Sequence, residues 1–215
     1  MAVKVKICGL NSAAAMAAAV AGGASHLGFV FYPPSPRALQ PAAAAALVRA
    51  VPKGIVKVGL FVDAGDETIA AVLKEAPLDM LQLHGDETPR RVKELRRRFA
   101  MPVMKALRIA SAEDIAAADE YLLAADWLLF DAKPPASMKG ALPGGNALSF
   151  DWALLAGRRW SKPWMLSGGL NAGNLAAAVA ATRATQVDVS SGVEDTPGRK
   201  NPEKIAAFLK LAATL

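Results

Sequence analysis

The stretch Lys4-Val5-Lys6-Ile7-Cys8-Gly9-Leu10 predicts a short buried β-strand that ends at the only cysteine of the chain. A glycine follows this cysteine, so we expect a loop to begin there. Free cysteine is among the most buried residue types, and packing in a core is its ordinary role. In parallel α/β proteins, however, side chains at the carboxyl ends of strands also meet the ligand. The rest of the chain must therefore decide whether Cys8 packs or reacts.

Strand-like stretches of this kind alternate with helical patterns from one end of the chain to the other. The eight predicted strands are Val3–Cys8, His26–Phe31, Val56–Val62, Met80–His84, Pro102–Leu107, Trp127–Asp131, Pro163–Ser167 and Gln186–Ser190. Such alternation indicates a parallel sheet. Eight strand–helix units in 215 residues favour a closed (β/α)8 TIM barrel over an open doubly wound sheet. We expect a single catalytic domain over residues 1–215, because no Pro/Ser-rich linker divides the chain.

Residues typical of helix starts agree with this division. Pro41, Pro89 and Pro202 fall at plausible first-turn positions. Asn171 and Asn201 are candidate N-caps of the seventh and eighth helices.

Composition narrows the class of protein. An apolar share of 53% supports a sizeable core, and the 20% of charged residues argues against disorder. A single cysteine excludes an intrachain disulfide or a cysteine-rich metal site. The two histidines, His26 and His84, lie far apart in sequence, so we expect no metal centre. With no apolar signal region and no apolar run near the roughly 18 residues of a membrane helix, we expect a cytoplasmic protein without a membrane partner.

The net charge of +6 is compatible with nucleic-acid binding or with attraction of a small anionic substrate. The densest basic segment, Arg90–Phe99, places Val92, Leu95 and Phe99 on one apolar stripe. This pattern favours a helix with a solvated basic face, and it lacks the interleaved aromatic residues on which bases stack. We therefore expect no nucleic-acid partner.

The segment Ala132–Asn146 is too long for a simple connection and is rich in Gly, Pro and Lys. Long loops within compact domains are usually functional lids or disordered segments. We favour a lid over the mouth of the barrel.

The predicted strand ends carry the candidate chemistry. Ser167-Gly168-Gly169 and Ser190-Ser191-Gly192 follow the seventh and eighth strands, where TIM barrels commonly bind phosphate. Asp131 ends the sixth strand, where a partly desolvated carboxyl group would have a raised pKa and could donate a proton, although it could equally cap a loop. Arg37 follows the second strand on a proline-stiffened loop and is either a carboxylate ligand or a surface arginine. Asp188 and His84 are weaker candidates that could instead satisfy backbone groups inside the barrel.

Together these segments resemble the phosphoribosylanthranilate isomerase family of tryptophan biosynthesis along the whole chain. The similarity is carried by Lys6-Ile7-Cys8-Gly9, Gly28–Tyr32, Ser35-Pro36-Arg37, Gly59–Asp63, Gln82–Gly85, Asp131-Ala132-Lys133, Phe150-Asp151-Trp152, Ser167–Leu170 and Asp188–Glu194.

The resemblance implies a cofactor-independent Amadori rearrangement, the third step from chorismate to tryptophan. N-(5-phosphoribosyl)anthranilate would become 1-(2-carboxyphenylamino)-1-deoxyribulose 5-phosphate. Asp131 would be the general acid that opens the ribose ring, and Cys8 the general base that removes the C2 proton. Arg37 would hold the anthranilate carboxylate, with His84 and Asp188 beside the substrate. The residues implied around the phosphate are Gly144, Gly145, Gly168, Gly169, Ser190, Ser191 and Gly192.

Two details qualify this expectation. A thiol near its ordinary pKa of about 8.5 is only a few per cent ionised at neutral pH, so we expect the pocket to lower the pKa of Cys8. After Gly144-Gly145 the family usually continues with Ser or Thr and then Gly, whereas this chain has Asn146-Ala147. Alanine lacks the freedom of glycine at positive φ, which bears on the geometry of the loop.

Other functions are weaker alternatives. A metal-dependent epimerase on the same fold would need several histidines at strand ends. The next synthase of the pathway would need catalytic lysine and glutamate there, a role that Lys6 and Lys105 fit less well. A basic RNA-binding protein is the alternative of a different class. The expected partner is a small phosphorylated substrate, and the oligomeric state is left open between monomer and homodimer.

Overall fold

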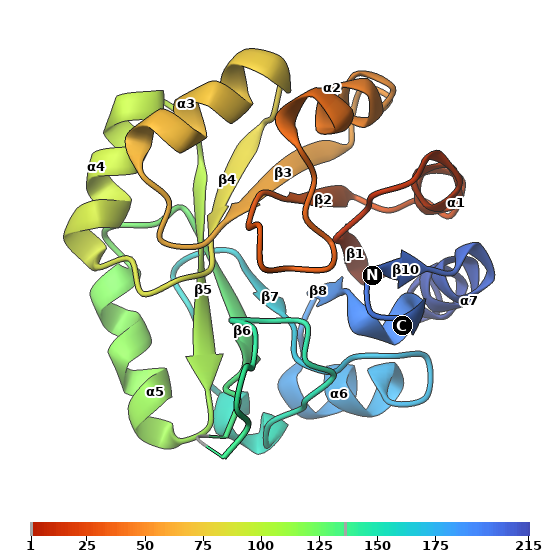
Figure 1. Cartoon of the computed structure of the whole chain (residues 1–215). Helices are drawn as coiled ribbons and strands as arrows, with labels where there is room; N and C mark the ends of the chain where they lie inside the picture. The colour runs from red at the N-terminus through yellow and green to blue at the C-terminus, as the bar shows by residue number, and fades with distance from the viewer. Residues whose placement is uncertain (1, 136) are drawn as a thin grey trace.

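The computed structural model describes residues 2–135 and 137–215, in which eight parallel strands close into a barrel surrounded by helices (Figure 1). The strands are β1 (Lys4–Cys8), β2 (His26–Val30), β3 (Val56–Phe61), β4 (Met80–Leu83), β5 (Val103–Ile109), β6 (Trp127–Ala132), β7 (Trp164–Leu166) and β8 (Gln186–Val189). Pairing follows chain order, and β8 pairs with β1 to close the ring. The predicted TIM barrel is confirmed, and each strand ends within two residues of its predicted bounds.

Seven α-helices and three 3-10 helices connect the strands within the described residues. They are α1 (Ala13–Ala21), α2 (Pro41–Arg49), α3 (Asp66–Glu75), α4 (Pro89–Phe99), α5 (Ala112–Ala117), η1 (Ala118–Tyr121), η2 (Trp152–Leu155), α6 (Leu175–Thr182), η3 (Ser191–Val193) and α7 (Pro202–Ala212). Pro41, Pro89 and Pro202 open their helices as predicted.

Of the two predicted N-caps of α6 and α7, one is confirmed and the other is wrong. The side chain of Asn201 accepts hydrogen bonds from the first turn of α7, as predicted. The prediction for Asn171 is wrong, because Asn174 occupies the N-cap position of α6. Asn171 instead belongs to a turn that precedes the helix and accepts from the backbone of Gly173 at 2.8 Å.

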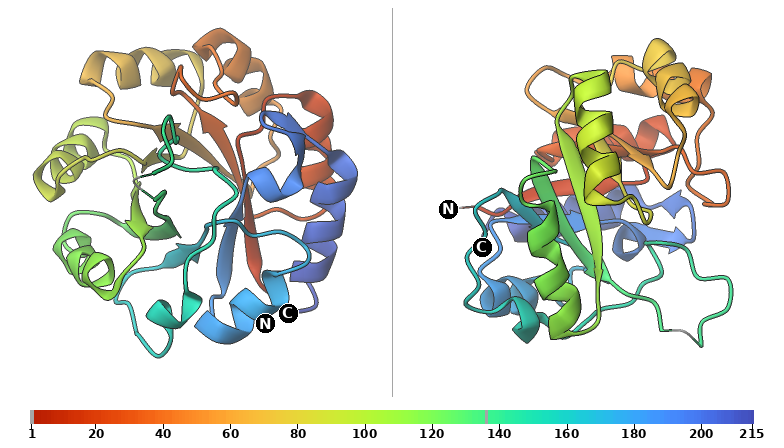
Figure 2. Two further views of the ribbon diagram at one scale, coloured as in Figure 1. Left: turned by 60° about the horizontal axis from the view of Figure 1, so that its bottom comes forward. Right: turned by 90° about the vertical axis from the view of Figure 1, so that its left-hand side faces the viewer.

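The sixth unit departs from the regular alternation. Between β6 and β7 the described residues contain only the short helix η2, and the segment before it crosses one end of the barrel (Figure 2). This is the segment predicted as a lid, although its Ala136 lies outside the described residues. The missing α-helix is consistent with the Gly- and Pro-rich sequence, since neither residue favours a helix interior.

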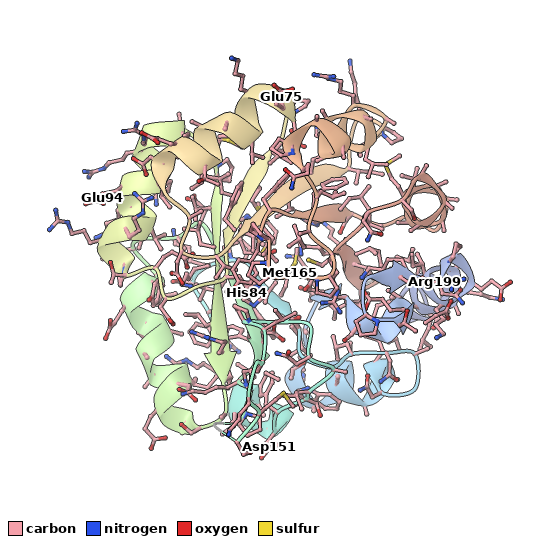
Figure 3. The ribbon with its side chains drawn as sticks, in the orientation of Figure 1. Glu75, His84, Glu94, Asp151, Met165 and Arg199 are labelled. Atoms are coloured by element: carbon pink, nitrogen blue, oxygen red, sulfur yellow. The ribbon has the colours of Figure 1, made fainter. Side chains whose placement is uncertain are left out.

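Apolar side chains fill the space between the barrel and the helices, and a second cluster fills the barrel itself. The inner cluster consists of Val58, Met80, Met104, Ala106, Leu129 and Met165. Figure 3 shows Met165 and His84 near the centre of the ring of strands, whereas Glu94 and Arg199 lie at the periphery. The barrel is therefore a packed core and not an open channel.

Helix α4 has the predicted basic character. Val92 and Leu95 are buried, and Phe99 packs partly against the core. Acidic neighbours pair with several of its arginines: Arg91 and Arg98 contact Asp66, and Arg90 contacts Glu94. These pairs support a solvated helix face. Across residues 2–135 and 137–215, no helix has the length and apolar character needed to span a membrane.

Candidate active site

A cavity of about 720 Å³, including its open mouth, lies at the carboxyl ends of the strands. Its lining of apolar side chains with a few polar groups is typical of a small-molecule site. Every predicted site residue except Gly192 lines it, and these residues are Cys8, Arg37, His84, Asp131, Gly144, Gly145, Gly168, Gly169, Asp188, Ser190 and Ser191. Residues from β1, β6 and β8 and from the loops after β2, β4, β6, β7 and β8 thus meet in one place.

Cys8 is the last residue of β1. Its side chain packs beside Val30 and Leu60 and lines the cavity. Lys6, two residues earlier on the same face of the strand, is fully buried beneath it. A β-carbon on Gly28 would lie 3.0 Å from the Cys8 Sγ and 3.1 Å from the Lys6 Nζ. Glycine at this position of β2 therefore leaves room for the thiol and the ammonium group to approach each other.

Asp188 of β8 completes this buried arrangement. It accepts from Lys6 Nζ at 2.8 Å and from the Ser167 hydroxyl at 3.1 Å. Burial by itself would lower the pKa of Lys6, but the charges of Asp188 and Cys8 and the hydrogen bonds to these two groups together outweigh it and raise that pKa. Asp188 therefore lines the cavity and pairs with two buried side chains, whereas the alternative prediction had it satisfy backbone groups of the barrel.

The expectation of a lowered Cys8 pKa is wrong. Burial raises the pKa of the Cys8 thiol, and the ammonium group of Lys6 opposes this shift only in part. The reason is desolvation, which disfavours the charged thiolate in an apolar surrounding. In the free protein Cys8 is thus a thiol at neutral pH, and its thiolate is a stronger base than an ordinary one.

Asp131 ends β6 with its carboxyl group in the cavity. Its Oδ1 accepts from the backbone N–H of Ala132 at 2.9 Å, and its Oδ2 lies 3.2 Å from Nε2 of His84. On the other side of the imidazole, Gln82 Nε2 lies 3.1 Å from His84 Nδ1. This geometry fits a neutral His84 that accepts from Gln82 and donates to Asp131. His84 therefore belongs to the site through its hydrogen bond to the Asp131 carboxyl group.

Loops after β7 and β8 form the opposite wall. Gly168 and Gly169 have φ angles of 88° and 62°, which glycine adopts readily. Among the described residues, their N–H groups have no protein acceptor and are free to bind an anion. Gly192 instead packs against the carbonyl of Leu170, where a β-carbon would come within 1.9 Å.

Arg37 is buried, not a surface arginine. Its Nε and Nη2 each donate to a carboxylate oxygen of Glu194 at 2.8 Å, and Nη2 also donates to the Gly145 carbonyl at 3.2 Å. The stem of Arg37 lies over Gly9, where a β-carbon would come 2.6 Å from its Cδ. The carboxylate-binding candidate is thus adjacent to Cys8 in space.

The segment predicted as a lid supplies the outer wall of the cavity through residues 142–146. Gly144 lies so close to the acid that a β-carbon would come 2.6 Å from Asp131 Oδ2. The Asn146 side chain bonds both backbone groups of Leu142, accepting at 3.1 Å and donating at 2.6 Å. Ala147 has a φ of 57°, a strained conformation for alanine. The chain therefore retains the left-handed turn although glycine is missing.

Several residues of this site had no predicted role. Lys6, Gln82, Ser167 and Glu194 were all within the stretches that carry the family resemblance, yet no function followed for them from the sequence. A buried arginine requires a counter-ion, which was the available signal for Glu194. Its partner could not be chosen, because Arg37 and Glu194 lie 157 residues apart.

Within the part of the chain that the structure describes, no group of three or more His, Cys, Asp or Glu side chains is placed to hold a metal. The donor set of the cavity consists of one thiol, carboxyl groups, an imidazole and backbone amides. Its arrangement suits proton transfer to and from a bound anion.

Comparison with known proteins gives a consistent result. The family model of N-(5'-phosphoribosyl)anthranilate isomerase matches residues 5–211. A relative of that name from Rhodospirillum centenum is 59% identical, with full coverage of both chains. A crystal structure of a phosphoribosylanthranilate isomerase in complex with reduced 1-(o-carboxyphenylamino)-1-deoxyribulose 5-phosphate has a TM-score of 0.85 and 34% identity, covering 99% of this chain and 100% of the other. The crystal structure of monomers generated from the dimeric phosphoribosylanthranilate isomerase of Thermotoga maritima has a TM-score of 0.84 and 34% identity, covering 99% of this chain and 100% of the other.

Proposed function

The chain belongs to the N-(5'-phosphoribosyl)anthranilate isomerase family, and from this premise we propose that Cys8 and Asp131 are its general base and general acid. The enzyme converts N-(5'-phosphoribosyl)anthranilate into 1-(2-carboxyphenylamino)-1-deoxyribulose 5-phosphate in tryptophan biosynthesis. This Amadori rearrangement turns an aldose derivative into a ketose by moving protons. The observation that carries the proposal is that a thiol and a carboxyl group line one cavity together with two anion-binding loops.

The first step assigned to this site is ring opening. Asp131 gives its proton to the ribose ring oxygen, the bond from this oxygen to C1 breaks, and the anthranilate nitrogen forms a double bond to C1. The nitrogen then carries the positive charge of a protonated Schiff base, and Asp131 is left as a carboxylate. The donors from Ala132 and His84 stabilise this carboxylate, because hydrogen bonds to a charged group are stronger than neutral ones.

The second step removes the proton at C2. The Cys8 thiol first loses its own proton to solvent, and the thiolate then takes the proton from C2. The C–H electron pair forms a C1–C2 double bond, and the nitrogen recovers its lone pair. The resulting enolamine gives the ketone when the hydroxyl on C2 loses its proton and C1 gains one. Lys6 supports the base, since its ammonium group favours the thiolate over the thiol. The cationic Schiff base formed in the first step favours the thiolate in the same way.

Anchoring at both ends of the substrate places C1 and C2 between these two groups. The N–H groups of Gly168 and Gly169, with the loop of Ser190 and Ser191, face the phosphate, as loops after strands 7 and 8 do in other barrels. Arg37 holds the anthranilate carboxylate at the other end. Gly144 and Gly145, predicted beside the phosphate, lie against Asp131 and Arg37 and in this proposal cover the substrate from the loop segment. Gly192 contributes by packing the two phosphate loops together.

The cellular setting and assembly belong to the same proposal. We place the reaction in the cytoplasm, where a functional thiol stays reduced. A relative from Thermotoga maritima is described as dimeric, so a homodimer is one of two assemblies under test and a monomer is the other. Sedimentation of the purified protein at several concentrations distinguishes them.

Two substitutions test the roles of the acid and the base. Cys8→Ser replaces the thiol with a hydroxyl of much higher pKa, and Asp131→Asn removes the proton donor at nearly constant shape. Each variant should lose at least about a hundredfold in kcat, because general acid or base catalysis contributes roughly 10²–10⁴. The assay follows the fluorescence of the anthranilate group, and circular dichroism checks the fold. Near-normal turnover in both folded variants would show that the site residues are assigned wrongly.

A further inference from the structure

The Arg37 guanidinium is held by a buried carboxylate at the edge of the cavity. Glu194 of β9 (Glu194–Thr196) accepts from Nε through one oxygen and from Nη2 through the other, both at 2.8 Å. The two side chains are only 4% and 2% exposed. Two parallel hydrogen bonds fix the plane of the guanidinium group, so its orientation is set before any ligand arrives.

Counting donors shows which edge of Arg37 is left for a ligand. A guanidinium has five N–H groups. Glu194 takes one from Nε and one from Nη2, and the Gly145 carbonyl takes the second from Nη2 at 3.2 Å. For Nη1 no acceptor is found among residues 2–135 and 137–215. This nitrogen lies against Gly145, where a β-carbon would come within 2.6 Å, on the loop that lines the cavity.

Lys200 of β10 (Arg199–Lys200) connects this arrangement to the rest of the site. Its fully buried ammonium group donates to Glu194 Oε1, to the Ser190 carbonyl at 3.2 Å and to the Ser190 hydroxyl at 3.3 Å. Three acceptors match the three donors of an ammonium group. The Ser190 hydroxyl in turn donates to the Cys8 carbonyl at 3.1 Å. One network thus joins the carboxylate-binding arginine, a phosphate loop and the backbone of the base.

The charges of this network are unequal. Arg37 and Lys200 are basic groups, and among the described residues Glu194 is the one acidic group that contacts both. Burial lowers the pKa of Lys200, and the charge of Glu194 opposes that shift. Burial would raise the pKa of Glu194, but its bonds to Arg37 and its neighbour Lys200 bring that pKa below its ordinary value. With both basic groups protonated, the cluster carries about one net positive charge, which one carboxylate of a ligand would neutralise.

We infer that Glu194 and Lys200 are positioning residues that aim Nη1 of Arg37 at the ring carboxylate of the substrate. They select substrates with this carboxylate without touching the reacting atoms. The inference rests on the proposed function, because it presumes that the anthranilate end lies at Arg37. A merely structural role for the same ion pairs would instead weaken the binding of any ligand of the cavity equally.

The test compares two stable ligands with the intact protein. One is the reduced product analogue with its ring carboxylate, and the other is the same molecule with a plain phenyl ring. In Glu194→Gln the amide nitrogen faces arginine donors, so one of the two bonds is lost. We expect the Kd of the carboxylated ligand to rise about tenfold or more, as loss of a charged hydrogen bond does. The Kd of the phenyl ligand should stay within about twofold. In turnover, KM should carry most of the effect.

Three further variants make the result specific. Asp195→Asn removes an exposed carboxylate from the same strand and should leave both Kd values unchanged. Glu194→Asp keeps the charge with a shorter reach and should give an intermediate loss. In an Arg37→Ala background, Glu194→Gln should add little to the Kd of the carboxylated ligand, because the two residues act as one unit.

The possible results distinguish the positioning role of Glu194 from the proposed enzyme activity. If both ligands weaken equally in Glu194→Gln, or neither weakens, the positioning role is wrong while the enzyme assignment stands. If Glu194→Gln does not fold, Glu194→Asp and Lys200→Met are judged by the same comparison of two ligands. A wild-type protein that does not turn over N-(5'-phosphoribosyl)anthranilate would overturn the proposed site roles and this inference together.

Discussion

At the scale of single residues, Cys8 experiences two opposing influences. The apolar contacts with Val30 and Leu60 disfavour its thiolate, whereas the buried ammonium group of Lys6 favours it. Burial prevails, so the pKa of the thiol lies above its ordinary value. A base of this kind is sparsely ionised in the free enzyme but strong once formed. The site therefore relies on the bound substrate and on Lys6 to supply the thiolate.

Alkylation of Cys8 by iodoacetamide tests this balance. The rate should rise with pH and have its midpoint above the ordinary thiol pKa of about 8.5, because only the thiolate reacts. Lys6→Met should move the midpoint to higher pH, since it removes the cation that opposes the shift. Lys4→Met, on an exposed position of the same strand, is the matched control and should leave the midpoint unchanged. A wild-type midpoint below pH 8 would contradict the account.

At the scale of elements, the segment between β6 and η2 is shaped by residues that replace the usual ones of the family. Asn146 ties both backbone groups of Leu142, which closes the turn beside the catalytic carboxyl group. Ala147 then takes a left-handed conformation at φ 57°. The turn is thus retained, with strain stored at one alanine.

Replacing this alanine by glycine should stabilise the protein. Ala147→Gly relieves left-handed strain of about 1–2 kcal/mol and adds unfolded-state entropy worth about 0.5–1 kcal/mol, so we expect a net gain of up to about 1 kcal/mol. Ala100→Gly is a matched control, because Ala100 caps α4 at φ 48° far from the lining of the cavity. Urea unfolding should show similar gains for both. A loss of stability in Ala147→Gly beside a gain in Ala100→Gly would argue against strain in the loop.

Sequence reasoning was most successful where one local pattern determines the structure. Buried runs such as 26–31 and 127–131 predicted strands, and the proline of Pro202 marked the start of α7. One failure came where two neighbouring residues compete for the same capping position. The Asn171 cap was wrong because a second asparagine, Asn174, stands nearer the helix.

The chemistry of the site followed the same division. Positions of candidate residues were predictable, since strand ends meet at one rim of a barrel, and 11 of the 12 line the cavity. The pKa shifts and ion pairs of these residues could not be predicted from the sequence. The direction of the Cys8 pKa depends on burial and on contacts from three strands, which a linear pattern does not give. The pairing of Arg37 with Glu194 likewise depends on how the hairpin of β9 and β10 folds back.

At the scale of the whole molecule, the two ends of the barrel have separate tasks. The rim at Cys8 and Asp131 holds the cavity and the proposed chemistry, while the opposite end is closed by packed side chains. His26 lies at that end, at the start of β2, bonded to the Ser25 hydroxyl at 2.9 Å and in edge contact with Trp127. Burial and the nearby charge of Lys6 lower the pKa of His26 to about 4. That the chain forms one domain over residues 1–215 stays a prediction.

His26 should make the stability of the barrel depend on pH. The unfolded chain protonates this residue near pH 6.5, whereas the folded protein does so only near pH 4. The unfolded state therefore binds more protons between these values, and stability falls as the pH decreases through this window. The contribution amounts to roughly 3 kcal/mol. Urea unfolding at pH 7, 6, 5 and 4 should show a shallower decline in His26→Gln than in the wild type. Parallel declines would refute the assignment.

A crystal structure with the reduced product analogue would show whether Cys8 and Asp131 lie on opposite faces of the bound sugar, as the proposed mechanism requires. The account predicts the phosphate against the loops of Gly168 and Ser190, with Cys8 Sγ within about 3–4 Å of C2. The Asp131 carboxyl group should lie on the other face of the ligand, near the oxygen released from the ring. A phosphate bound elsewhere, or a thiol and carboxyl group on the same face of the ligand, would contradict it.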